Sequence, residues 1–143
     1  FEDLEVGMRG EYSRRISQAD VEHFAKVSGD VNPLHLDTVF ARRTMFKGPI
    51  VHGMYTAAML STVIGTRLPG PGCIYMSQNI RFLAPVRVGE EVVASATVVE
   101  LFHGKHRARL ETLCQVGEIE VVRGAALILV PTRAQLHALT DTG

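Results

Sequence analysis

Residues 52–66 read HGMYTAAMLSTVIGT, and almost every position in this run is apolar or small. A helix that is apolar on nearly all sides is buried on all sides. Small residues such as Ala57 and Ala58 let a sheet approach such a helix closely. The run therefore predicts one long central helix enclosed by the rest of the chain.

Strands are predicted on the C-terminal side of this helix, after the turn formed by residues 69–72 (Pro-Gly-Pro-Gly). Charged residues alternate with apolar ones from Arg107 to Thr112, as in a half-buried strand. A glycine within the last strand, Gly124, indicates a β-bulge. The four expected strands cover residues 74–82, 91–102, 107–112 and 118–130. This order predicts an α+β fold in which a four-strand antiparallel meander surrounds the helix.

The N-terminal third predicts a strand over residues 8–16 and then two helices. Ser17 and Asp20 have the spacing of a capping box, and the apolar stripe that follows ends at Gly29. A polar loop with Asn32-Pro33 comes next, because the residue before proline avoids the helical region. Asp37 is placed to cap a short second helix over residues 37–43.

Composition limits the class of protein. A chain of 143 residues fits a single domain over residues 1–143. Lys+Arg and Asp+Glu both number 15, so no net field favours nucleic acid or an anionic membrane. No apolar run approaches the roughly 20 residues of a membrane span, and the acidic start is unlike a signal peptide. Cys73 and Cys114 lack metal spacing and are expected to be reduced, which favours the cytoplasm.

The loop of residues 28–35, Ser-Gly-Asp-Val-Asn-Pro-Leu-His, contains the first candidates for chemistry. Asp30 and His35 are five residues apart and together are suited to hold one water molecule and supply two proton transfers. Hydration of a conjugated thioester needs such transfers, and donors for an enolate oxygen as well. Alternatively, Asp30 only caps a turn, and Asn32-Pro33 is a common loop dipeptide.

Gly53 is the candidate donor for that oxygen. It is expected in the first turn of the central helix, where backbone N–H groups are unpaired and the helix dipole is positive. Glycine also allows a carbonyl oxygen to approach the backbone closely. Further candidates for substrate contacts are Asn32, His52, Ser61 and Ile64. For Ser61 the structural alternative, a hydrogen bond to the carbonyl one turn earlier, is preferred.

Two histidine groups raise the question of a metal. His103 and His106 are three residues apart at an expected hairpin turn and have no third ligand nearby. Asp30, His35 and His52 match the composition of a two-histidine, one-carboxylate site. Two histidines at a hairpin turn without a third ligand are more typical of a solvated turn than of a metal site.

The loop resembles the signature of the MaoC-like (R)-specific enoyl-CoA hydratases, Gly-Asp-x-Asn-Pro-aliphatic-His, with a small residue six positions later. The matching residues are Gly29, Asp30, Asn32, Pro33, Leu34, His35 and Ala41. Phe24 and Ser28 also match upstream, and residues 49–54, 82–86 and 88–90 resemble later segments of the family.

This resemblance implies a hot-dog fold, a homodimer and a hydro-lyase. The implied reaction is reversible syn addition of water to trans-2-enoyl-CoA, giving (R)-3-hydroxyacyl-CoA. Asp30 and His35 would hold the water, and the Gly53 N–H would bind the thioester carbonyl. No cofactor is implied, because coenzyme A is part of the substrate. No metal is implied at Asp30, His35 and His52 either, because hydration of an activated alkene needs none. Such enzymes can supply monomers for polyhydroxyalkanoate synthesis from β-oxidation.

Two other functions stay open at this point. A hot-dog thioesterase would share the fold and release free CoA thiol. A non-catalytic acyl-CoA-binding or dimerisation module would bind enoyl-CoA without turning it over, although the Asp30–His35 pair argues against it.

Overall fold

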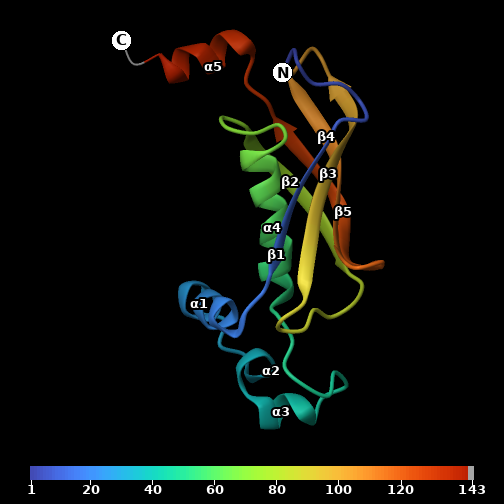
Figure 1. Ribbon diagram of the computed structural model, residues 1–143. Helices are drawn as coiled ribbons and strands as arrows, with labels where there is room; N and C mark the ends of the chain where they lie inside the picture. Colours follow the sequence, from blue (N-terminus) through green and yellow to red (C-terminus); the bar gives the residue numbers. More distant parts are fainter. Residues whose placement is uncertain (142–143) are drawn as a thin grey trace.

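The computed structural model describes residues 1–141, so the last two residues of the expected 1–143 domain lie outside the described part. One long helix, α4, lies along a five-stranded antiparallel sheet, and three shorter helices gather near its first turn (Figure 1). The elements are β1 (Arg9–Arg15), α1 (Gln18–Ser28), α2 (Pro33–Leu36), α3 (Thr38–Arg42), α4 (Gly53–Thr66), β2 (Ile74–Phe82), β3 (Glu91–Phe102), β4 (Arg107–Val116), β5 (Ile119–Leu129) and α5 (Arg133–Thr140). Every predicted element is present, which confirms the α+β class.

The strand order is β1-β3-β4-β5-β2. Strands β3, β4 and β5 form a meander, but β2 pairs with β5 and not with β3, so the predicted four-strand meander is wrong. Strand β1 fills the place beside β3 instead. Sequence order alone cannot distinguish these pairings, because residues 83–90 form a connection long enough to cross from one edge to the interior. Strands β1 and β2 are therefore the two edges of the sheet.

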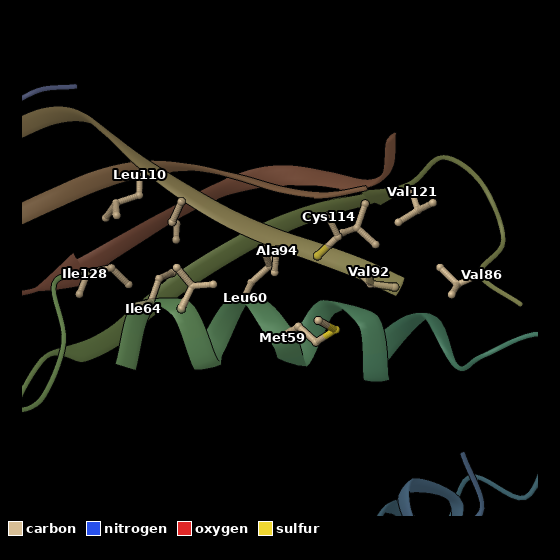
Figure 2. Close-up of a cluster of buried hydrophobic side chains, with 14 of the residues drawn as sticks. Met59, Leu60, Ile64, Val86, Val92, Ala94, Leu110, Cys114, Val121 and Ile128 are labelled. Atoms are coloured by element: carbon tan, nitrogen blue, oxygen red, sulfur yellow. The ribbon is translucent and has the colours of Figure 1, made fainter. Parts of the chain in front are cut away.

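Packing of α4 on the sheet forms the core. Leu60 and Ile64 point from the helix toward the strands that carry Ala94 and Leu110 (Figure 2), and Met59 belongs to the same buried cluster. Each of these side chains is at most 4% exposed, and burial of a large apolar side chain contributes about 1.5–3 kcal/mol. The helical and strand periodicities in the sequence thus converge on a single apolar cluster.

The prediction that α4 is buried on all sides is wrong for a single chain. Met54, Ala58, Ser61 and Gly65 are exposed, and their spacing of three or four residues places them on one stripe. The sheet covers only the opposite side of the helix, where Thr56, Met59, Leu60, Val63 and Ile64 are buried. Among residues 1–141, no helix is both long and apolar enough to cross a membrane.

Side-chain caps set the ends of the early helices. Ser17 and Asp20 form the predicted capping box, and Gly29 ends α1 with a φ of 78°. Asp37 caps α3 as predicted, through the Phe40 N–H. Two helices were not predicted. Helix α2 begins after Asn32, which caps it with proline at the first position, and α5 has a Thr132–Gln135 capping box.

Gly124 is not a bulge. It pairs in regular register with Ile80 on β2 and with Thr112 on β4, and the register shifts of β5 lie elsewhere. Its role is close packing, because a Cβ at this position would lie 1.8 Å from the Asn79 carbonyl oxygen. A glycine within a strand signals either a bulge or such an approach, and the sequence does not separate the two.

We expect Gly124→Ala to lower the free energy of unfolding by about 3 kcal/mol, because β2 must move away from the new methyl group. Gly104→Ala is the matched control, since a Cβ there meets nothing within 4 Å. Urea denaturation of both variants measures the difference. Equal stabilities would show that β2 and β5 are not packed this tightly.

Candidate active site

The first turn of α4 meets the loop between α1 and α2, at the end of the molecule where the short helices gather (Figure 1). Asp30, His35 and His52 each have a polar atom within 4.8 Å of the others. The structure thus brings together the carboxylate and the imidazole that the loop sequence singled out, and adds the histidine that precedes α4.

A chain of side-chain-to-backbone hydrogen bonds shapes the loop. The Ser28 hydroxyl donates to the Phe24 carbonyl oxygen (2.7 Å) and accepts from the Asp30 N–H (3.1 Å). Asp30 Oδ1 then accepts from the Asn32 N–H (3.2 Å), and Asn32 Oδ1 accepts from the Leu34 N–H (3.0 Å). These bonds fix the Asp30 carboxylate through Oδ1. Asp30 is exposed, so Oδ2 is available to a ligand.

His35 is oriented by a backbone carbonyl group. Its Nδ1 lies 2.7 Å from the Ile50 carbonyl oxygen, and only 7% of the residue is exposed. A carbonyl oxygen only accepts, so Nδ1 carries the hydrogen in this pair. The lone pair of the neutral ring is therefore on Nε2, which is the atom that can accept a proton or a hydrogen bond from water.

Two backbone donors are free at the start of α4. His52 precedes the helix and makes no side-chain cap, and within residues 1–141 the Gly53 and Met54 N–H groups have no hydrogen-bond acceptor. Such N–H groups, with the positive end of the helix dipole, favour a negatively charged oxygen. An enolate oxygen is a ligand of this kind.

A pocket of about 500 Å³ opens beside these donors. Asp30, His52 and Gly53 belong to its wall, and His35 lies next to them. The rest of the wall is mainly apolar and includes Met45, Phe46, Phe82, Leu83, Pro85 and Val122. An apolar pocket with a few convergent polar groups is typical of a small-molecule site.

The loop that carries Met45 and Phe46 was missed by the sequence reasoning. The Arg87 guanidinium fixes it by donating to the carbonyl oxygens of Phe46 and Gly48, the second at 3.2 Å. Lys47, between them, has a φ of 60°, a value rare for a residue other than glycine. No local pattern signals these bonds, because Arg87 and the loop are about 40 residues apart in the chain.

Three predicted substrate contacts lie outside the pocket wall. Asn32 caps α2 with its side-chain oxygen. Ile64 is 1% exposed because it faces the sheet in the core. Ser61 is on the exposed stripe of α4, and within residues 1–141 its hydroxyl does not make the expected bond to the carbonyl one turn earlier. In a single chain, these three residues are structural or exposed.

Asp30, His35 and His52 have the spacing of a metal site, but the two rings do not share an ion in this arrangement. Their centroids are 3.9 Å apart and their planes differ by 29°. A histidine binds an ion in its own ring plane at about 2.0–2.1 Å, and planes tilted so little meet much farther away. The expected absence of a metal stays a prediction, supported by this stacking.

Comparison with known proteins gives a consistent result. The profile of the family described as MaoC like domain matches residues 3–121. The 3-hydroxybutyryl-CoA dehydratase of Methylorubrum extorquens is 48% identical over 97% of this chain and 88% of its own length. The (R)-specific enoyl-CoA hydratase of Rhodospirillum rubrum is 43% identical over 93% of this chain and 92% of its own.

A solved structure agrees with the predicted fold. The (R)-hydratase from Aeromonas caviae involved in PHA biosynthesis superposes with a TM-score of 0.88 at 43% identity. The match covers 92% of this chain and 100% of that chain. This likeness confirms the hot-dog fold.

Gly53 packs closely against the Phe82 ring, so substitutions at these two positions should have non-additive effects on stability. A Cβ at Gly53 would lie 2.7 Å from Phe82 Cε1. We expect Gly53→Ala to cost about 1–2 kcal/mol of stability, and much less when Phe82→Ala is already present. A double-mutant cycle by urea denaturation measures the coupling. Additive effects would show that the ring does not press on Gly53.

Proposed function

This chain belongs to the MaoC-like domain family, and from that membership we propose that it is an (R)-specific enoyl-CoA hydratase. It is a hydro-lyase that adds water reversibly to a short- or medium-chain trans-2-enoyl-CoA and yields the (R)-3-hydroxyacyl-CoA. The observation that carries this proposal is the Asp30–His35 pair beside the free Gly53 N–H, on the wall of an apolar pocket.

In the proposed reaction, one water molecule lies between Asp30 and His35 Nε2. Asp30 takes a proton from this water while the water oxygen bonds to C3 of the enoyl group. The π electrons of the conjugated double bond move to the thioester oxygen. The Gly53 N–H stabilises the resulting enolate, and such donors contribute about 3–4 kcal/mol to lowering a barrier. His35 orients the water. The proton that Asp30 took then passes to C2 on the same face, with His35 assisting its delivery, which completes syn addition and restores the Asp30 carboxylate.

The remaining features of the proposal follow from this chemistry. Every atom that the reaction transfers comes from water, so no metal or cofactor is needed, and coenzyme A is part of the substrate. A cytoplasmic location is supported by the two free thiols, Cys73 and Cys114. The likeness to the Aeromonas caviae (R)-hydratase involved in PHA biosynthesis supports a role in supplying monomers for polyhydroxyalkanoate synthesis, from β-oxidation intermediates.

The direct test is incubation of the protein with crotonyl-CoA, with loss of the enoyl thioester absorbance as the readout. A coupled dehydrogenase selective for (R)-3-hydroxyacyl-CoA reports the stereochemistry, and a parallel thiol assay reports thioester hydrolysis. Enoyl loss with (R) product and without free thiol supports the hydratase. Thiol release would indicate a thioesterase instead, and binding of several enoyl-CoA chain lengths without turnover would indicate a binding module.

A homodimer is also part of the proposal, and the two sheet edges differ in a way that supports it. Edge strand β1 carries Arg9, Glu11, Arg14 and Arg15, charges that discourage strand pairing. Edge strand β2 carries one charged residue, Arg81, near its end, and Ile74, Tyr75 and Met76 are exposed on it. A second copy on the β2 side would cover this edge, and the exposed stripe of α4 is available to the same partner.

We expect Asp30→Asn to lower kcat about 10²- to 10⁴-fold, because the amide cannot take the proton. Its oxygen can still accept from the Asn32 N–H, so the loop and the unfolding midpoint should change little. Asp37→Asn is the matched control, since asparagine also caps α3 and Asp37 lies outside the pocket wall. Near-normal turnover by Asp30→Asn would contradict the assigned role.

The dimer is tested by the same substitution on the two edges. Ser77, next to the middle of β2, and Ser13, on β1, are both exposed. In a twofold dimer paired through β2, Ser77→Lys brings two positive charges close together, so the dimer Kd should rise about tenfold or more. Ser13→Lys should leave it unchanged. Light scattering across a dilution series measures both, and an unaffected Ser77→Lys dimer would place the interface elsewhere.

A further inference from the structure

His52 is almost completely enclosed at the centre of the site, with 1% of its surface exposed. The Phe24 ring lies on it at a centroid distance of 4.8 Å, and the His35 ring stacks on it at 3.9 Å with 29° between the planes. It makes no cap for α4, the usual structural task at its position. Its burial therefore needs another explanation.

The explanation lies in the one hydrogen bond that the His52 ring makes within the described part of the chain. His52 Nε2 is 2.9 Å from the backbone carbonyl oxygen of Asp30. The carbonyl oxygen only accepts, so Nε2 is the donor and Nδ1 is left with the lone pair of the neutral ring. Nδ1 is buried and has no hydrogen-bond partner within residues 1–141. Within residues 1–141, the single hydrogen bond of this ring is thus made with the residue that carries the reactive carboxylate.

His52 consequently contacts both reacting residues without being one of them. It holds the backbone of Asp30 by a hydrogen bond across 22 residues of chain, and it contacts the face of His35. His35 is also fixed by the bond between its Nδ1 and the Ile50 carbonyl oxygen, so bond and stacking together leave the ring little freedom to tilt. His52 also directly precedes Gly53 in the chain, so its position is tied to that of the free N–H groups of α4.

We propose that His52 is a positioning residue that sets the separation of the Asp30 carboxylate and the His35 imidazole, chiefly through its Nε2–H bond to the Asp30 carbonyl oxygen. This inference rests on the proposed function, because it concerns the two groups that would hold the water. It differs from substrate binding, the role expected from sequence, since a buried Nδ1 offers no donor or acceptor to a bound thioester.

Two amide substitutions separate the hydrogen bond from other effects. In His52→Gln the amide nitrogen falls near the former Nε2 and can still donate to the Asp30 carbonyl oxygen. In His52→Asn the side chain is one methylene shorter, and its nitrogen falls near Nδ1 and does not reach. Both remove the stacking on His35. We expect His52→Asn to lower kcat about 10- to 100-fold with KM within about threefold, and His52→Gln to recover most of that loss.

Val63→Ala is the control for stability alone, because Val63 is a fully buried core residue on the same helix, outside the pocket wall. It should lower the denaturation midpoint and leave kcat per folded enzyme unchanged. Equal kcat values for the Gln and Asn variants, or a rise in KM at constant kcat, would overturn the proposal. If Asn does not fold, His52→Phe replaces it, since it keeps a ring and lacks the donor.

These outcomes are distinct from failure of the proposed function. If the unmodified protein does not hydrate enoyl-CoA, the proposed function is wrong. The positioning role of His52 is then tested on the structure of the Asp30 loop and not on activity. In that case protection of the Asn32 amide from hydrogen exchange, which depends on its bond to Asp30 Oδ1, should fall in His52→Asn and persist in His52→Gln. Equal protection in both would overturn the positioning role independently of activity.

Discussion

The contact between α4 and the sheet is the constraint on which the rest of the structure depends. The helix is fixed against the strands by four buried side chains, Met59, Leu60, Val63 and Ile64. The position of its first turn relative to the sheet is therefore fixed as well. The unpaired N–H groups of the first turn can act on a reacting ligand only if that turn lies beside the reactive side chains. The packing of one apolar face thus determines where a negative charge can be stabilised.

Local signals accounted for most elements, because caps, proline and alternation act within a few residues. The capping box at Ser17, the end of α1 at Gly29 and the alternation in β4 were all predicted and confirmed. The failures concern contacts between distant residues. The pairing of β2 with β5, the Asn79 carbonyl against Gly124 and the open side of α4 depend on what the folded chain brings near, which no local pattern contains.

In the candidate site, too, the features with local signals were predicted and those that depend on distant contacts were not. The Asp30–His35 pair was predicted from its spacing, and its placement beside Gly53 agrees with the expected geometry, but the apolar wall from the Arg87-held loop was not predicted. The two interpretations of Asp30 are also compatible. Its Oδ1 closes a turn by accepting from the Asn32 N–H, as the structural alternative held, and Oδ2 stays available for chemistry. One carboxylate thus serves the loop and a ligand with different oxygens.

The contrast between the two sheet edges has a consequence for how far such a protein can assemble. In the proposed dimer the two β2 edges pair with each other, and both ends of the joined sheet are β1 strands, each with three arginines and one glutamate. Neither end accepts a further strand readily, so growth is self-limiting after one association step. An unpaired β2 edge on an isolated chain is, by contrast, open to pairing with strands of other proteins, and association with a second copy removes that hazard.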